Sequence, residues 1–304
     1  MNKRLLLLKL LLKETNIFYF NLFNKENLVQ MKNYLLLFSA LIITLAISCV
    51  SDDEVIIEPS TTIDLVFKAN YGAEPAQMQK EYVYGDADEK DIKFIQMDFF
   101  VSNITLMKEI SPNSSEIELK EIDFVSLSYT DPNDVAQGYT ISIDKVPTGT
   151  YAGMKIGIGV PADLNRTKPE DYGSTHVLNK NSHYWEGWTS YIFTKIEAAA
   201  DLNNDGDIIL GGAAGEGLSY HTGTDAVYQE VVIPKDIALT EDVNFTIDLN
   251  LDLNQVFQTS NPDHDTNNDG FLDLETFRGT HSEDNLEVAK KIMENLANSI
   301  TLDF

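Results

Sequence analysis

Residues 265–275 have the spacing of a calcium-binding loop. Oxygen-bearing side chains occupy alternate positions, a glycine stands at position six where the chain must turn sharply, and the next residue offers its carbonyl. The candidate ligands are Asp265, Asn267, Asp269, the carbonyl of Phe271, Asp273 and Glu275. Thr276 stands at position twelve, where such loops usually carry a bidentate glutamate. We predict a calcium site here, the alternative being an acidic, solvated loop.

A second acidic segment repeats the first half of this pattern. Its candidate ligands are Asp201, Asn203, Asp205 and Asp207, with Gly206 at the turning position. The next three residues, 208–210, are apolar, so the sequence supplies no side-chain oxygen to close a shell. A turn held by side-chain hydrogen bonds is therefore as good an interpretation as a calcium ion.

The five histidines are the remaining candidates for metal chemistry, and they are scattered. They are His176, His183, His221, His264 and His281. Neutral imidazole is a common metal ligand, but a single histidine is more often a surface or core residue, so a site would need the fold to bring several together. The chain has no glycine-rich phosphate loop, no nucleophile elbow and no His-Glu-x-x-His motif. We therefore expect a protein that is not an enzyme.

Residues 183–197 concentrate the aromatic side chains and contain both tryptophans, Trp185 and Trp188. The second half of the segment alternates in the manner of a strand. The aromatic half could form a binding platform at the mouth of a β-core. The simpler interpretation, which we favour from the sequence, is that the two tryptophans fill one end of that core.

Alternation of apolar and polar residues dominates the rest of the chain and predicts strands. The clearest case is residues 243–254, where every odd position is apolar and every even position is polar. Shorter runs occupy residues 63–67, 97–106, 117–119, 141–143, 151–160, 191–196 and 227–233. The apolar positions change parity between Phe94 and Met97, which predicts a bulge. We predict an all-β fold, an antiparallel β-sandwich of Greek-key, immunoglobulin-like type with long loops.

One helix is predicted, at the C-terminal end. Ser282 is placed to cap it, and two acidic residues follow where the helix dipole favours them. One face is apolar and consists of Leu286, Ala289, Met293, Leu296 and Ile300. We expect this face to pack on the sandwich.

The N-terminal region reads as a secretory signal that ends in a lipoprotein box. Lys32 supplies positive charge, residues 35–47 are apolar, and residues 46–49 read Ala-Ile-Ser-Cys. The apolar run is shorter than the roughly 20 residues of a membrane-spanning helix, the alternative interpretation. We therefore predict a misassigned extension at 1–30, a signal peptide at 31–48, lipid attachment at Cys49, an acidic tether at 49–61 and one β domain at 62–304.

The mature chain is expected to be strongly acidic and free of disulfides. Six of the 22 basic and two of the 48 acidic residues lie in residues 1–48, which leaves 16 basic against 46 acidic residues, a net charge of −30. Such a surface repels nucleic acid and anionic lipid, so only the lipid anchor would touch the membrane. Cys49 is the only cysteine and cannot pair within the chain; its alternative role is a free thiol. The acidic residues that follow it resemble a tag for export to the cell surface, the alternative being a plain solvated tether, so we predict a surface-exposed outer-membrane lipoprotein.

Several segments, taken in order, resemble the MbnP-like family of copper-binding proteins associated with methanobactin operons. The matching pieces are residues 65–67, 99–106, 146–151, 156–160, 184–193 and 219–223, followed by His281 and the helix at 289–299. The order and spacing carry the resemblance, which covers about residues 62–304. It implies a β-sandwich that binds copper outside the cytoplasm.

The resemblance also implies which residues would hold the metal. His221 and His281 match positions where relatives carry histidine, His183 is a third candidate, and Trp185 and Trp188 would wall the site. In some relatives a di-haem peroxidase partner oxidises a tryptophan of the site to kynurenine. This chain departs from the pattern, because Lys68 and its neighbours stand where many relatives have a histidine, and the mature chain has no Trp-x-His.

Two functions from different classes follow. The first is a non-catalytic copper-binding lipoprotein with His221, His281 and His183 as ligands. The second is a calcium-stabilised surface module that binds a glycan or a protein through the aromatic segment.

Overall fold

The computed structural model describes residues 59–85, 90–209, 215–241 and 243–304. The chain divides into two units, Met1–Ile57 and Glu58–Phe304. The first unit lies outside the described residues, and with it the predicted extension, signal peptide, Cys49 and most of the acidic tether. Within the described ranges, no helix combines the length and the hydropathy that crossing a membrane would require.

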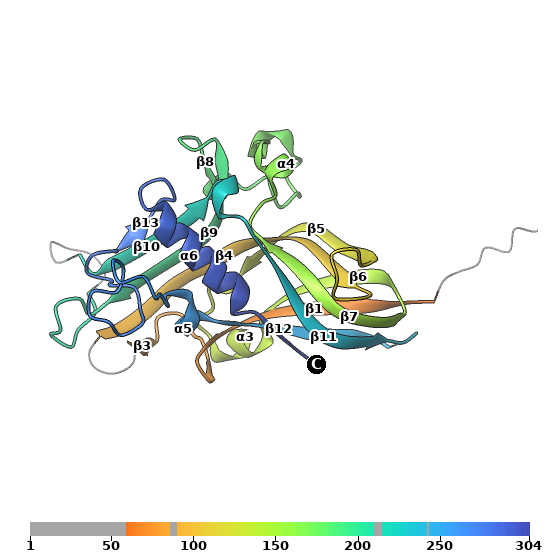
Figure 1. Cartoon of the computed structure of the whole chain (residues 1–304), viewed down its shortest axis with the longest axis horizontal. Coiled ribbons are helices and arrows are strands. Elements are labelled where there is room, and N and C mark those ends of the chain that lie inside the picture. The colour runs from red at the N-terminus through yellow and green to blue at the C-terminus, as the bar shows by residue number, and fades with distance from the viewer. Residues whose placement is uncertain (1–58, 86–89, 210–214, 242) are drawn as a thin grey trace, which may run out of the picture. The chain divides into compact units, whose positions relative to one another are not determined.

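The described unit is built from two sheets (Figure 1). The smaller sheet has five strands in the order β14-β12-β1-β2, with β6 also paired to β1. Their bounds are β1 Ser60–Tyr71, β2 Glu74–Pro75, β6 Tyr139–Pro147, β12 Phe245–Asp252 and β14 Thr301–Asp303. Strand β1 begins inside the last two residues of the predicted tether, where Thr61 is already buried.

The larger sheet has nine strands in the order β11-β7-β4-β9-β10-β13, with β3 and β5 also paired to β4 and β8 paired to β9. The bounds are β3 Glu81–Tyr84, β4 Lys90–Met107, β5 Glu116–Ser126, β7 Gly149–Ile158, β8 Tyr184–Trp185, β9 Ser190–Ala200, β10 Gly217–Gly223, β11 Gln229–Leu239 and β13 Gly279–Thr280. The short helices are α3 Pro132–Gln137, α4 Ala162–Asn165 and α5 Leu253–Val256, and the long one is α6 Leu286–Asn298.

The predicted β-sandwich with a C-terminal helix is confirmed. Strand β4 shifts register between Phe94 and Gln96, which is the bulge that the change of parity predicts. Two strand pairs, β1 with β12 and β10 with β13, are parallel in a sheet system that is otherwise antiparallel. The parallel pairs join segments far apart in sequence, and alternation within a strand carries no information about the direction of its partner.

The core lies between the two sheets. On β12 the odd positions Ile247, Leu249 and Leu251 have no exposed surface, which is the buried face that the alternation predicts. Phe67 on β1 meets Phe99 on β4 edge to face, with ring centroids 6.1 Å apart. The packing of these apolar faces provides the main stabilisation, since the described unit contains no cysteine to form a disulfide.

Helix α6 lies against the nine-stranded sheet (Figure 1), and its buried residues include Val288, Ala289, Ile292, Met293 and Leu296. The predicted face is right for Ala289, Met293 and Leu296, but Leu286 is 37% exposed and Ile300 lies beyond the end of the helix. The prediction that Ser282 caps this helix is wrong. The helix begins after Asn285, and Ser282 has a positive φ of 55° and no exposed surface. Its hydroxyl instead accepts a hydrogen bond from the main-chain N–H of Gly223, which ties the approach to α6 to the end of β10.

His183 belongs to this packed structure. Its ring lies 4.7 Å from that of Phe124 and 6.1 Å from that of Phe100, and only 3% of the residue is exposed. Burial, assisted by the positive charge of Lys195, lowers the pKa of His183 from 6.5 to about 3. The imidazole is therefore neutral in the folded protein at neutral pH.

We expect His183 to make the fold sensitive to acid. A histidine with a lowered folded pKa stabilises the fold fully above its unfolded pKa, and that contribution is lost as the pH falls from 6.5 towards 3. Between pH 7 and pH 5 the loss should be about 2 kcal/mol, at about 1.4 kcal/mol per unit. Denaturant unfolding at both pH values should show this loss in the wild type and a smaller one in His183→Gln. Equal losses in the two proteins would contradict the assignment.

Candidate metal centre

The fold brings His221 and His281 together. Their ring centroids are 5.4 Å apart and the rings are nearly perpendicular, at 82°. The two residues are 60 positions apart in sequence, so only the tertiary structure unites them. This pair is the clearest cluster of metal-ligand side chains in the described residues.

Strand register explains why the two histidines meet. Strands β10 and β13 are parallel, with Ser219 opposite Gly279 and Tyr220 opposite Thr280. The next position on each chain is a histidine, so His221 and His281 continue the same register. Gly279 is required for this close approach, because a Cβ at that position would lie 2.2 Å from the main-chain oxygen of Ser219.

Hydrogen bonds from the neighbouring residues hold His281 in place. The main-chain N–H of Ser282 donates to the Thr280 hydroxyl, and the N–H of Glu283 donates to the His281 carbonyl. Together with the bond between Ser282 and Gly223, these contacts fix the chain on both sides of His281. The imidazole itself is 42% exposed at the side chain, with Nδ1 4.0 Å from Asp284 Oδ2.

His221 is oriented by a carboxylate on the neighbouring strand. Its Nε2 makes a short hydrogen bond with Glu197 Oε1 on β9, and the Ser219 hydroxyl donates to the same carboxylate oxygen at 3.2 Å. A carboxylate on Nε2 favours the tautomer with the proton there, which leaves Nδ1 as an acceptor. Nδ1 is buried and has no hydrogen-bond partner. This is the arrangement that a metal-ligating histidine usually has.

Both tryptophans lie beside the histidine pair. The ring centroids of Trp185 and Trp188 are 6.0 and 6.5 Å from that of His281, and 5.7 Å from each other. Trp188 packs over Gly223, where a Cβ would lie 3.0 Å from its Cζ3 atom. Trp185 is 44% exposed. The interpretation favoured from the sequence, that both tryptophans fill one end of the core, is therefore wrong for Trp185. The two indoles form one wall next to the histidines.

His183 lies apart from the pair. It sits over β4, with Nε2 3.7 Å from Asp98 Oδ2 and without a hydrogen-bond partner. In the sheet, Asp98 on β4 is opposite Lys195 on β9, which in turn is opposite His221 on β10. A whole strand and a lysine therefore separate His183 from His221, and the structure does not bring this third candidate ligand to the other two.

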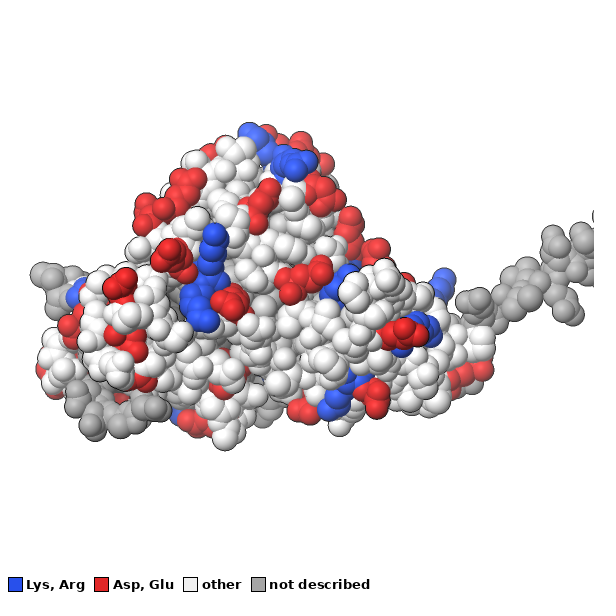
Figure 2. Space-filling model, in the orientation of Figure 1, with Lys and Arg blue, Asp and Glu red and all other residues white. Residues whose placement is uncertain are grey.

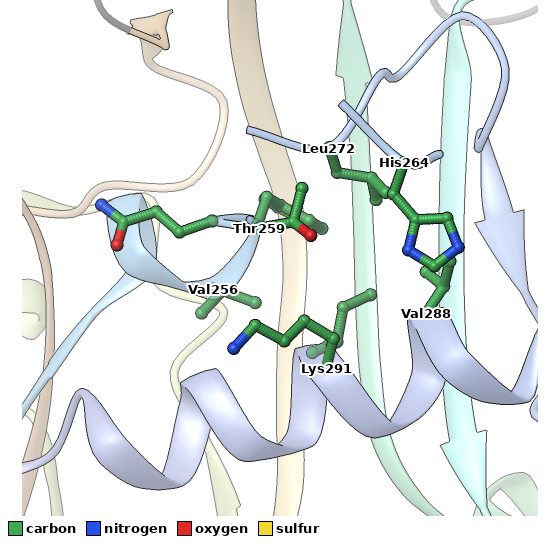
Figure 3. Close-up of a pocket in the computed structure, with 9 residues that line it drawn as sticks. Val256, Thr259, His264, Leu272, Val288 and Lys291 are labelled. Carbon is green, nitrogen blue, oxygen red and sulfur yellow. The ribbon is translucent and has the colours of Figure 1, made fainter. Parts of the chain in front are cut away.

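The remaining two histidines have other neighbours. His176 is exposed and stacks on Tyr172, with ring centroids 4.2 Å apart. His264 packs edge to face on Phe277 at 4.9 Å and lies beside a small pocket with Lys291 of α6 (Figure 3). That pocket has a volume of about 10 Å³, room for about one water molecule, and it adjoins a larger, open hollow of about 320 Å³ that His264 and Lys291 also line.

The two acidic loops share one conformation. The first carboxylate of each loop, Asp265 or Asp201, is buried and accepts hydrogen bonds from the main-chain N–H groups at loop positions five and six, at distances of 2.8–3.1 Å. The asparagine at position four and the glycine at position six have positive φ in both, at Asn268, Gly270, Asn204 and Gly206. The sequence pattern therefore translates into the same turn twice.

Asp273, one of the two residues predicted with Glu275 to close the shell of the 265–275 loop, is already engaged in hydrogen bonds. Asp273 accepts hydrogen bonds from the hydroxyls of Thr266 and Thr276 and from the N–H groups of Glu275 and Thr276. Partial burial acts to raise the pKa of Asp273, but these hydrogen bonds outweigh it and lower the pKa. Asp273 thus closes the loop through hydrogen bonds in this structure.

The other loop has a carboxylate that sequence reasoning missed. Glu216, just before β10, is 1% exposed, and its Oε2 accepts a hydrogen bond from the N–H of Ile209. It stands fifteen positions after Asp201, beyond the spacing of a standard loop, so no local pattern points to it.

The residues present fit a metal only in part. No three side chains among histidine, cysteine, aspartate and glutamate converge on a single point in the described ranges. The histidine pair nevertheless offers one buried, unpartnered nitrogen and a second imidazole beside it. Imidazole nitrogens suit copper, zinc, iron and nickel, so the chemistry of the pair is compatible with a transition metal.

Comparison with known proteins places the chain in a family. The family model described as MbnP matches residues 60–273, a range that contains His221 but ends before His281. No curated protein matches the chain. Among solved structures, MbnP from Methylosinus trichosporium is similar, with a TM-score of 0.44 and 13% identity over 66% of this chain and 79% of that one. Because the family model matches well over half of its residues, the chain belongs to the MbnP family.

Proposed function

We propose that this protein binds copper at the His221–His281 pair and has no catalytic activity of its own. The observation that carries the proposal is the contact between the two imidazoles, 5.4 Å between centroids, with Nδ1 of His221 buried and unpartnered. Membership of the MbnP family supports a metal-related role for the chain.

The surroundings of the pair favour a cation. Glu197 would keep the proton of His221 on Nε2 and would strengthen the ligand character of Nδ1. The chain as a whole carries a formal charge of −26, and acidic side chains are spread over the face seen in Figure 2. Such a surface attracts cations at long range.

The two tryptophans would shield one side of the metal, and the ring of Trp185 would remain accessible to an oxidant from solvent. Trp185 is accessible, 44% exposed, and its ring lies 6.0 Å from that of His281. If a di-haem peroxidase is a partner, as the resemblance implies, Trp185 is the residue that it could reach from outside. Trp188 is half-buried against β10 and is the less accessible of the two.

A second candidate function is a surface module that binds a glycan or a protein through the exposed indole of Trp185 beside Trp188. The observation that favours it is the exposure of Trp185, because an accessible aromatic ring is a common contact for a sugar ring or a partner side chain. Replacing Trp185 by alanine would abolish such binding. Copper binding by the same protein would identify the first function as the better account.

Removal of either histidine should abolish tight copper binding. In a Cu(I) titration against a competing chelator, His221→Ala and His281→Ala should each lose more affinity than the 10–100-fold typical of a change outside the ligands themselves. His176→Ala is the matched control, because His176 is exposed and stacks on Tyr172 away from the pair. Equal copper retention by wild type and both variants would refute the proposal.

Glu197 should affect copper affinity without binding the ion. Glu197→Gln keeps the size of the side chain but removes the charge that orients His221. We expect a roughly 10–100-fold weaker copper affinity with an unchanged stoichiometry. Glu230→Gln, on the exposed side of β11, is the control for the loss of one negative charge. An effect of the same size in both variants would indicate a general electrostatic effect in place of ligand orientation.

We also propose that the protein is an outer-membrane lipoprotein, anchored through Cys49 and exposed at the cell surface. In cells grown with a radiolabelled or clickable fatty acid, the wild type should be labelled and found in the membrane fraction. Cys49→Ser should be unlabelled and released from the membrane. Labelling of the serine variant would show that the anchor lies elsewhere.

A further inference from the structure

Glu216 is a buried carboxylate that the histidine centre does not use. The residue is 1% exposed and its Oε1 has no hydrogen-bond partner. A buried charge without a partner is costly, so such a group in a native structure requires an explanation. The residues around Glu216 support a bound cation as that explanation.

Hydrogen bonds place Glu216 between the two ends of the acidic loop that begins at Asp201. Its main-chain oxygen accepts from the N–H of Ala200, the residue before the loop, and its Oε2 accepts from the N–H of Ile209, two residues after Asp207. These two hydrogen bonds hold the buried carboxylate of Glu216 beside the segment that contains the loop, with Oε1 unpartnered.

The loop itself presents the oxygens that calcium prefers. Asp201 is 6% exposed and receives the N–H groups of Asp205 and Gly206, which leaves further lone pairs on both of its oxygens. Asn203 and Asp205 each accept a main-chain N–H two residues ahead, so both side chains are folded in over the turn. Calcium takes six to eight such oxygens, and in the standard loop a bidentate glutamate at position twelve completes the shell.

We propose that Asp201, Asn203, Asp205, the carbonyl of Asp207 and Glu216 form a calcium site, with Glu216 as the closing ligand. Three carboxylates give the site the negative charge that a divalent cation needs. The carboxylates do not already meet at one point, so the ion would draw Glu216 towards Asp201 as it binds. The proposal is independent of copper, because it uses neither His221 nor His281 as a ligand.

A calcium ion at this site would stabilise the connection between β9 and β10. Strand β9 carries Glu197 and β10 carries His221, and the two strands pair from Ala199 opposite Gly217 onward. The loop at 265–275 has the same turn but lacks a buried, unpartnered carboxylate beside it among the described residues. The sequence pattern points more strongly to the loop at 265–275, whereas the unpartnered carboxylate of Glu216 favours the loop at 201–207.

The test is a calcium titration of the full chain, purified without added calcium, by isothermal titration calorimetry with CaCl₂ and separately with MgCl₂. The wild type should bind calcium in preference to magnesium. Glu216→Gln, which preserves side-chain size, should weaken calcium binding at this site by at least about tenfold, because calcium affinity follows the number of charged ligands. Asp205→Asn should also weaken calcium binding at this site. Because Asp205 is exposed, this substitution does not disturb the core, whereas Glu216 is buried.

Asp265→Asn is the matched control, since Asp265 holds the equivalent position in the other loop. Normal calcium affinity in this variant, with weak binding in Glu216→Gln and Asp205→Asn, would support the proposal. Calcium binding that is lost in Asp265→Asn and retained in the other two would overturn it and assign the ion to residues 265–275. Absence of calcium binding by the wild type would also overturn it.

Discussion

The parallel pairing of β10 with β13 is the constraint on which the candidate centre depends. Strand β13 has only two residues, Gly279 and Thr280, yet its register determines where His281 lies relative to His221. A two-residue strand cannot hold that position alone. The hydroxyl of Ser282 accepts a hydrogen bond from the N–H of Gly223 at the end of β10, and α6 packs on the same sheet. The residues that follow His281 therefore fix its position.

The same arrangement explains the chemistry of the pair. Position 221 faces Lys195 across β9 and β10, and Glu197 lies beside it to accept a hydrogen bond from Nε2. Nδ1 of His221 is buried and has no protein hydrogen-bond partner, while the side chain of His281 is 42% exposed. One imidazole is thus positioned by the sheet and the other is reachable from solvent, an arrangement suited to the capture of an ion from outside.

Much of the fold is predictable from the sequence, because it depends on patterns within single elements. The alternation at residues 243–254 identifies the buried face of β12, the parity change identifies the bulge at Phe94, and the apolar stripe identifies α6. The contact between His221 and His281 joins two segments that are distant in sequence, so no pattern within one element predicts it. Only the resemblance to a family indicates these two residues.

The parts that the sequence does not predict are contacts between distant segments. Ser282 has the residue type of a helix cap, but its hydroxyl instead accepts a hydrogen bond from the main-chain N–H of Gly223 on β10. Glu216 is one of many glutamates, and only its burial against the 201–209 segment distinguishes it. Trp185 reads as a core residue by type, yet its place on the short strand β8 leaves it on the surface.

The most direct test of the central claim is to locate copper in a crystal of the copper-loaded protein by anomalous scattering at the copper edge. The account predicts one strong peak between the rings of His221 and His281, at bonding distance from Nδ1 of His221. A peak at His183 beside Asp98, or at His264 beside Phe277, with none at the pair, would contradict it.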